Sequence, residues 1–255
     1  MGAFTFGTFD TDAAGLIIGG QNTFNFARRD RTFVPIQGRN GDLIVDNGRY
    51  VNSTVIYAVF VPDNFAEKRD ALIHGLTSQG SGYVKLRDTY HPQKYRMAVL
   101  DTDIEFATGM LNRYGRCDIV FDCMPQIFLD AGDEEVILPS TGGDVEILGE
   151  QPSLPMIKVY TADSMSGEYI GGSISIDDFQ ITIGRAANIA TSSIIYIDCE
   201  AQVIRKENSL ITSGITLIGD FPKLDPNANN SGICHIESSI SDVDHIGVMG
   251  KWWGL

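Results

Sequence analysis

The chain has 255 residues, of which 33 are acidic and 19 basic, so its formal net charge is −14. Hydrophobic residues make up 43% of it and the mean hydropathy is −0.02, enough apolar material for a buried core, which excludes an intrinsically disordered chain. The acidic balance argues against a nucleic-acid binder and against docking on an anionic membrane, because both need lysine and arginine. The length fits one large domain or two small ones.

No segment approaches the roughly 18 apolar residues that a membrane helix needs. The first residues lack the basic and apolar parts of a signal peptide, and Phe6 stands where a myristoylation site needs Ser or Thr. We therefore expect a soluble protein that is made without secretion. The cysteines lack the short paired spacing of a zinc site and are expected to be buried, reduced thiols: Cys117, Cys123, Cys199 and Cys234.

Apolar residues alternate with small or polar ones along much of the chain, which predicts β-strands. Near the start this pattern occurs in two pairs of phenylalanines: Phe4 with Phe6, and Phe24 with Phe26. Two segments then have the composition of tight turns: Asn40-Gly41 and Asp46-Asn47-Gly48. Longer runs rich in Ile, Val, Tyr, Phe and Thr predict strands at 51–61, 97–106, 173–176, 179–183 and 194–197.

One segment, residues 64–78, has the periodicity of a helix instead. Its apolar residues fall on one helical face: Phe65, Leu72, Ile73 and Leu76. Asn64 and Glu67 have the spacing of a capping box, and Gly80 is placed to end the helix. We expect one amphipathic helix packed on a sheet.

Residues 130–152 consist of short acidic pieces with Gly and Pro, which predicts loops and a domain boundary. Beyond them, strands recur at the spacing typical of an all-β sandwich. Split after Glu135, the two parts carry net charges of −5 and −9. The sequence thus predicts a mainly β protein with two domains. Residues 1–135 form a β-barrel or sandwich-like domain with one α-helix, and residues 136–255 form a β-sandwich.

Three carboxylates alternate with other residues in a predicted strand, which would place them on one face: Asp101, Asp103 and Glu105. Such a group could hydrolyse a glycoside or bind a hard cation, but a solvated strand face is the favoured interpretation. The chain has neither a nucleophile elbow nor a phosphate-binding glycine loop. We expect no enzyme and no catalytic residue.

Two histidines near the end of the chain, His235 and His245, flank Glu237, Asp242 and Asp244. These side chains can bind metals but have no recognised metal-site spacing, so a surface loop is the favoured interpretation. We expect no metal and no cofactor.

Two groups of residues are candidates for interfaces. Arginines gather in a strand–turn–strand context, where they meet either an acidic surface of a partner subunit or acidic residues of the same chain: Arg28, Arg29, Arg31 and Arg39. The adjacent Trp252 and Trp253 would be costly to leave in water, at about 25 cal/mol per Å2 of apolar surface. They are expected to dock on a domain or across a subunit interface.

Five short motifs follow one another from residue 34 to the last residue. They are Val34-Pro35 with Gly38-Arg39-Asn40-Gly41, Asp88-x-Tyr90 with Tyr95-Arg96, Phe121-x-Cys123-x-Pro125, Gly219-Asp220-Phe221-Pro222-x-Leu224, and Lys251-Trp252-Trp253-Gly254-Leu255. In this order they resemble the distal tail (Dit-type) proteins of long-tailed, siphovirus-like bacteriophages. The chain departs from that pattern at four positions: Ile36 and Gln37 are extra, Asn227 stands where a glycine is expected, and Gly250 stands where a proline is typical.

The resemblance implies a structural virion protein of the tail tip that forms a homohexameric ring. In such proteins the first domain lines the ring, the second is a galectin-like β-sandwich, and the C-terminal tail, here residues 245–255, can pack back on the first domain. The implied partners are further copies of the chain, the tail tube protein, and tail-tip, baseplate or receptor-binding proteins. DNA would pass through the ring without sequence-specific recognition. The subunits would be made in the host cytoplasm.

Two alternatives remain open. The second domain could be a carbohydrate-binding module for host-surface glycans, with Tyr160, Tyr169 and Tyr196 as the available rings, although core packing is favoured for them. The less favoured alternative is a glycosidase that uses the carboxylates of residues 101–105.

Overall fold

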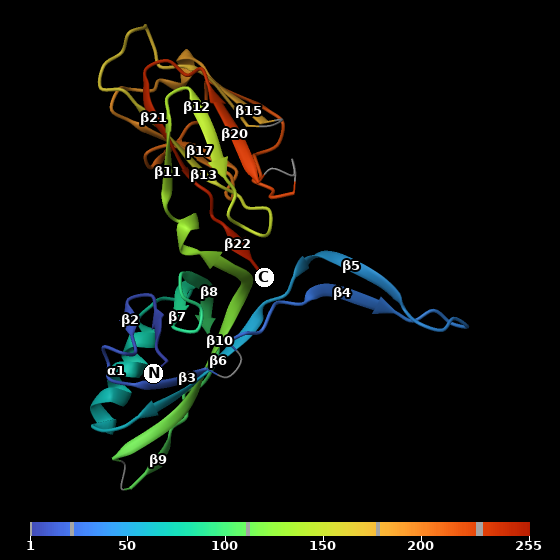
Figure 1. Cartoon of the computed structure of the whole chain (residues 1–255), viewed down its shortest axis with the longest axis vertical. Coiled ribbons are helices and arrows are strands. Elements are labelled where there is room, and N and C mark those ends of the chain that lie inside the picture. Colours follow the sequence, from blue (N-terminus) through green and yellow to red (C-terminus); the bar gives the residue numbers. More distant parts are fainter. Residues whose placement is uncertain (1, 21–22, 111–112, 177–178, 228–231) are drawn as a thin grey trace. The chain divides into compact units, whose positions relative to one another are not determined.

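The computed structural model describes residues 2–20, 23–110, 113–176, 179–227 and 232–255. The chain divides into two compact units (Figure 1). The first runs to Ile127 and includes Leu255, and the second comprises Phe128–Gly254. Both are built mainly of β-strands, and the described residues contain one α-helix, which confirms the predicted fold class. The units differ in charge: the first has 13 basic and 14 acidic residues, the second six and 19, so their net charges are −1 and −13.

The first unit is organised around one curved sheet with the strand order β2-β1-β7-β8-β10-β6-β3, with β9 paired to β10. A long ladder joins β6 and β10 in antiparallel register, from Ser53 opposite Cys123 to Val61 opposite Gly115. The strand bounds are β1 Phe4–Phe6, β2 Phe9–Asp10, β3 Ile17–Gly20, β6 Ser53–Val61, β7 Val84–Asp88, β8 Lys94–Leu100, β9 Ala107–Gly109 and β10 Tyr114–Leu129.

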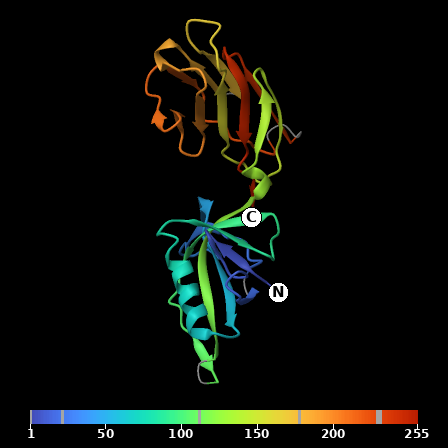
Figure 2. The same ribbon diagram turned by 90° about the vertical axis from the view of Figure 1, so that its left-hand side faces the viewer.

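The helix α1 (Phe65–Thr77) covers one face of this sheet (Figure 2) and buries Phe65, Leu72 and Leu76. The helix is confirmed, but the capping box is wrong. Asn64 adopts a left-handed conformation, with φ 45°, and its side chain makes no cap hydrogen bond. The helix also ends at Thr77, with Ser78 rather than a glycine as its C-cap. The apolar residue Ile73 of the predicted helical face is 37% exposed.

Several predicted strands and turns of the first unit differ from the structure. The pair Phe24 and Phe26 lies outside any strand and is exposed. The run 97–106 leaves the sheet after Leu100, and a separate short strand, β9, follows. Asp46-Asn47-Gly48 lies inside a strand, β5 (Leu43–Tyr50), rather than in a hairpin turn. Alternation alone does not tell a paired strand from an extended segment, which explains these errors.

The second unit contains two sheets with the orders β11-β21-β13-β16-β17-β18 and β12-β20-β14-β15-β19. Residues 130–152, predicted as loops, contribute one strand to each sheet, β11 and β12. The bounds are β11 Glu135–Pro139, β12 Gly142–Glu146, β13 Met156–Thr161, β14 Gly172–Ile176, β15 Phe179–Ile183, β16 Ile194–Asp198, β17 Val203–Lys206, β18 Ser209–Leu210, β19 Ile215–Ile218, β20 Ile233–Ser238 and β21 Val243–Met249. A last short strand, β22 (Trp253–Gly254), belongs to neither sheet and pairs with β10.

The two units bury different kinds of core. Among the described residues, the core of the second unit has 22 buried members, 13 of them isoleucine. Most of the 22 come from alternate positions of strands in both sheets. The core of the first unit has 17 members, five of them aromatic. All four cysteines are buried and free, as predicted. No helix in the described part of the chain is long and apolar enough to cross a membrane.

Candidate functional site

The hairpin of β4 (Arg29–Val34) and β5 (Leu43–Tyr50), here called the arm, forms a two-stranded sheet of its own. Figure 1 shows it extending away from the sheet of the first unit. Six large apolar side chains of the arm are between 40% and 58% exposed: Phe33, Val34, Ile36, Leu43, Ile44 and Val45. A lone hairpin is at best marginally stable in water, and clustered exposed apolar side chains mark interaction sites. The arm is therefore the strongest candidate for an assembly surface.

The cross-strand register places apolar side chains on both faces of the arm. Phe33 lies opposite Ile44 and Val34 lies opposite Leu43, and neighbouring pairs point to opposite faces. Near its base the register shifts between Arg29 and Arg31, opposite residues 47–49 of β5. Gly48 has φ 73° and donates its backbone N–H to the Asp46 carboxylate at 2.8 Å. A glycine tolerates this conformation without a Cβ clash, so the predicted turn residues form a bulge that twists the arm.

The four predicted arginines all lie on or beside the arm. Arg29 and Arg31 both approach the Asp46 carboxylate, at 3.2 and 3.7 Å, so these two meet an acidic residue of the same chain. Arg28 precedes β4, and its carbonyl accepts the N–H of Val51. Arg39 is exposed in the turn between the strands.

Ion pairs and hydrogen bonds set the electrostatics of the arm. The hydrogen bond from Gly48, together with the nearby Arg29 guanidinium, lowers the pKa of Asp46. Hydrogen bonds from Arg49 and Asn47 likewise lower the pKa of Asp30. Residues 28–50 contain five arginines and three aspartates, so the arm is net positive in a chain of charge −14. An acidic surface is the partner that this charge favours.

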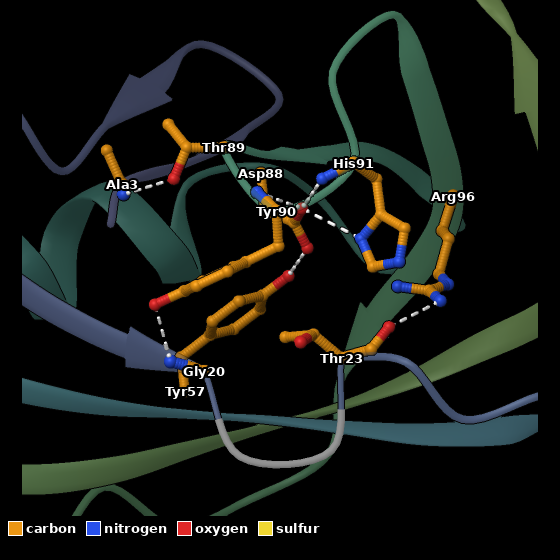
Figure 3. A network of polar contacts seen from close by, with 9 residues as sticks. All are labelled: Ala3, Gly20, Thr23, Tyr57, Asp88, Thr89, Tyr90, His91 and Arg96. Carbon is orange, nitrogen blue, oxygen red and sulfur yellow. Dashed lines mark hydrogen bonds and ion pairs between the residues drawn. The ribbon is translucent and has the colours of Figure 1, made fainter. Parts of the chain in front are cut away.

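A buried polar network lies on β7, β8 and the turn between them (Figure 3). Asp88 accepts the N–H groups of Tyr90 and His91 at 3.0 and 2.8 Å, and its other oxygen accepts the hydroxyl of Tyr57. Burial, reinforced by the Asp88 charge, raises the pKa of Tyr57, which keeps this hydroxyl protonated as a donor. The ring nitrogen Nδ1 of His91 also lies 3.0 Å from the Asp88 carboxylate. These four contacts hold Asp88 and fix the turn after β7.

The same network anchors the chain just before the arm. Arg96 is 4% exposed and donates to the carbonyl of Thr23 at 2.8 Å (Figure 3). The ring centroid of Phe24 lies 5.0 Å from that of His91. The sequence marked Asp88, Tyr90 and Arg96 only as part of a family motif. The role of Arg96 depends on Thr23, which is 73 positions away.

The terminal tryptophans dock within the second unit. Trp252 is 1% exposed and belongs to the core of this unit, and its carbonyl accepts the N–H of Leu129 at 2.9 Å. Trp253 donates its indole N–H to the carbonyl of Pro152, also at 2.9 Å. A Cβ at Gly132 would lie 2.4 Å from the backbone nitrogen of Trp252, so this close approach requires a glycine. Hydrogen bonds and burial together hold the end of the chain.

The predicted strand face of carboxylates does not exist, because residues 101–106 form no strand. Asp101, Asp103 and Glu105 are exposed along an extended segment, while the intervening Ile104 and Phe106 pack against the first core. The alternation thus reflects one buried side of an unpaired segment rather than a catalytic face.

The two C-terminal histidines lie on strands β20 and β21, so the predicted surface loop is wrong. His235 contacts Asp144 at 2.6 Å and Glu237 at 3.5 Å, and the hydrogen bond to Asp144 raises the pKa of His235. His245 instead stacks on Tyr160, with ring centroids 4.1 Å apart. In the described ranges, no three metal-binding side chains form a group that could hold an ion.

The three tyrosines considered for sugar binding do not form one platform. Tyr160 is stacked under His245, and Tyr196 lies under the guanidinium of Arg205 at 4.6 Å. Tyr169 is 42% exposed and lies outside the strands, in the connection between β13 and β14.

The fold of the chain is similar to the folds of solved phage tail proteins. The chain matches the SPP1 Dit (gp 19.1) protein, described as a paradigm of the hub adsorption apparatus in phages that infect Gram-positive hosts. The TM-score is 0.69 and the identity 11%, over 97% of this chain and 98% of the other. The phage P2 baseplate in its activated conformation matches at TM-scores of 0.51 with Ca and 0.50 with Sr. Both P2 matches are 11% identical and cover 97% of this chain.

No family model and no curated protein matches the chain. The full-length likeness nevertheless confirms the Dit-type resemblance at the level of the fold, because both units are included in the aligned length.

Proposed function

We propose that the chain is a structural, non-enzymatic protein of a phage tail tip, where it acts as a hub that joins the tail tube to tail-tip or baseplate proteins. The observation that carries this proposal is the full-length likeness of the fold to a Dit hub protein. The resulting location is the virion, at the distal end of the tail. The subunit would be made in the host cytoplasm.

The hub would be a homohexameric ring, and the arm supports this form of assembly. An extended, net positive hairpin with exposed apolar faces fits a different, acidic surface on the next copy. Such a contact is heterologous, because it joins two different surfaces of the same protein. When the rotation that relates neighbouring copies closes on itself, repeated contacts of this kind form a ring without free ends. The first unit has a net charge of −1, so it adds little electrostatic repulsion to this contact.

The second unit would be a galectin-like sandwich that faces away from the ring axis. Its net charge of −13 would keep the six copies apart and soluble, whereas contacts along the tail would use the first unit. The ring channel would let DNA pass without sequence-specific contacts. Baseplate or receptor-binding proteins would be the further partners.

The native mass of the purified full chain tests this proposal. We expect six times 27.9 kDa, and rings in negative-stain images. The double variant Phe33→Asp, Ile44→Asp should remain folded but lose the ring, because it places charges on one apolar face of the arm. A matched control, Ile137→Asp with Leu148→Asp, changes exposed apolar residues of the second unit and should keep the ring. A wild-type monomer at high micromolar concentration that forms no ring with tail tube protein would refute the proposal.

A further inference from the structure

An apolar groove opens at one edge of the second unit. Each sheet ends there in an edge strand, β18 in one sheet and β19 in the other, and these two strands are consecutive in the chain. The groove has a volume of about 320 Å3, and all but two of its lining residues, Gln202 and Thr212, are apolar. The apolar lining residues include one core member, Ile204, and three residues packed against the core: Ile211, Ile215 and Phe221. The hydrophobic core therefore reaches solvent at this edge.

The strand that borders the groove lacks the usual protection of a sheet edge. Exposed edge strands normally carry charged residues, prolines or bulges that prevent pairing with other chains. β19 reads Ile215-Thr216-Leu217-Ile218, without a charge or a proline. Leu217 and Ile218 are 45% and 56% exposed, and Leu210 on β18 is 63% exposed. This edge is suited to pairing with a further strand.

The backbone of β19 is also oriented for pairing. Gly184 donates its N–H to the carbonyl of Gly214 at 2.7 Å, which turns the backbone groups of Gly214 toward β15. Because these groups alternate in an antiparallel ladder, those of Ile215 and Leu217 point to the open edge. The side chains of the same two residues line the groove. One extended segment could therefore hydrogen-bond to the edge and fill the groove at once.

We propose that this groove binds an extended segment of a different protein, which adds as a strand to β19 and places apolar side chains at alternate positions in the groove. Strand addition of this kind takes its affinity from main-chain hydrogen bonds and its specificity from pockets for alternate side chains. The groove belongs wholly to the second unit, so the proposal goes beyond the ring and does not depend on it.

Charge narrows the identity of the occupant. The segment that lines the groove, residues 202–221, is neutral, with Arg205 and Lys206 against Glu207 and Asp220. The second unit as a whole has a net charge of −13, and this longer-range field favours a segment with lysine or arginine on either side of its groove-binding part and disfavours pairing with the same unit of a second copy. A sugar fits the groove poorly. Phe221 is its one aromatic lining residue, and only two polar side chains line it. Sugar sites need hydrogen-bonding groups that converge on the ligand.

Synthetic peptides of about eight residues test the proposal with the full chain. The probe alternates valine and threonine between lysine pairs. One comparison peptide replaces the lysines by glutamates, and another keeps the lysines but has a central proline. We expect the lysine-flanked probe to bind and to slow amide exchange at Ile215 and Leu217. The glutamate version should bind about tenfold more weakly, and the proline version should not bind.

Three variants locate the site. Leu217→Lys places a charge in the groove, and Leu217→Pro removes a backbone donor that points to the open edge without breaking the ladder to β15. Both should abolish binding while thermal unfolding shows a folded chain. Ile137→Lys makes the same charge change on the exposed edge strand β11 and should leave binding intact.

Three results would overturn the proposal. One is the absence of binding by every peptide. Another is binding that survives Leu217→Lys or that is equal for the proline version. The third is a native mass that falls in Leu217→Lys but not in Ile137→Lys, because this would show that the groove joins copies of the chain. Failure of the ring proposal would appear separately, in the native mass of the wild type.

Discussion

The two units use the same kind of secondary structure and differ in what they leave to solvent. The first has a net charge of −1 and exposes an apolar arm. Its core contains packed aromatic rings, such as those of Phe4 and Phe121, whose centroids are 5.6 Å apart. The second has a net charge of −13 and packs mainly isoleucine between two sheets. Near-neutral units with exposed apolar surface associate, whereas strongly charged units repel one another. The contrast is the basis for the proposed assembly through the first unit and for the proposed binding at the edge of the second.

The largest effect is expected at Trp252, whose ring completes the core of the second unit. Replacing it with Ala should cost about 3–5 kcal/mol, because it leaves a cavity in a closed core. Two-wavelength thermal unfolding would show the transition of the second unit lowered and that of the first unchanged. Trp253→Ala removes a half-buried ring and should cost less. Equal losses in both variants would contradict the role assigned to Trp252.

A smaller loss, about 2 kcal/mol, is expected for Arg96→Met in the first unit. The variant leaves the buried carbonyl of Thr23 without its donor. Hydrogen exchange should become faster at residues 23–28, at the base of the arm, while the second unit is unaffected. Lys94→Met, at an exposed position of the same strand, is the control. Unchanged exchange in Arg96→Met would mean that the network does not anchor the arm.

Thiol labelling compares the stability of the two units directly. Burial raises the pKa values of Cys117, Cys123 and Cys199 to about 12, so we expect almost no reaction with a thiol reagent at about pH 8 in the native chain. On heating, Cys199 should be labelled together with the second unit and Cys117 with the first, as resolved by mass spectrometry. Rapid labelling of a native cysteine would show that its unit opens locally.

The arm should loosen at low pH. The folded pKa of Asp46 is lowered, so its contribution is present above its unfolded pKa of about 3.9 and is lost as pH falls through the lower folded value. Amide protection of β5 should therefore decrease below about pH 4. Asp46→Asn should lack this dependence. The effect is small because the carboxylate is exposed.

The smallest effect is expected in the second unit, and its dependence on pH has the opposite sign: the stabilising contribution is lost as the pH rises. The folded pKa of His235 is raised by Asp144, so the contribution of this pair is full below the unfolded pKa of about 6.5 and is lost as pH rises through the folded value. A titration of the imidazole by NMR in wild type and Asp144→Asn measures it. An unchanged titration would show that the pair does not form in solution.

Local pattern predicted much of this protein. Alternating apolar residues indicated most strands, the periodicity of residues 64–78 indicated the helix, and low polarity indicated that Trp252 and the cysteines are buried. These features depend on neighbours in the sequence or on the cost of exposing apolar surface, and both can be read from residue types.

Tertiary structure alone decided the rest. Whether an alternating segment pairs depends on distant strands, so residues 101–106 stay outside the sheet and residues 130–152 supply strands to two sheets. The arginines of the arm reach Asp46 only through hairpin register, and Arg96 reaches Thr23 only because the fold brings them together. The sequence determined which residues must avoid water, and the fold determined which polar groups meet and which apolar surfaces, the arm and the β19 edge, remain open to partners.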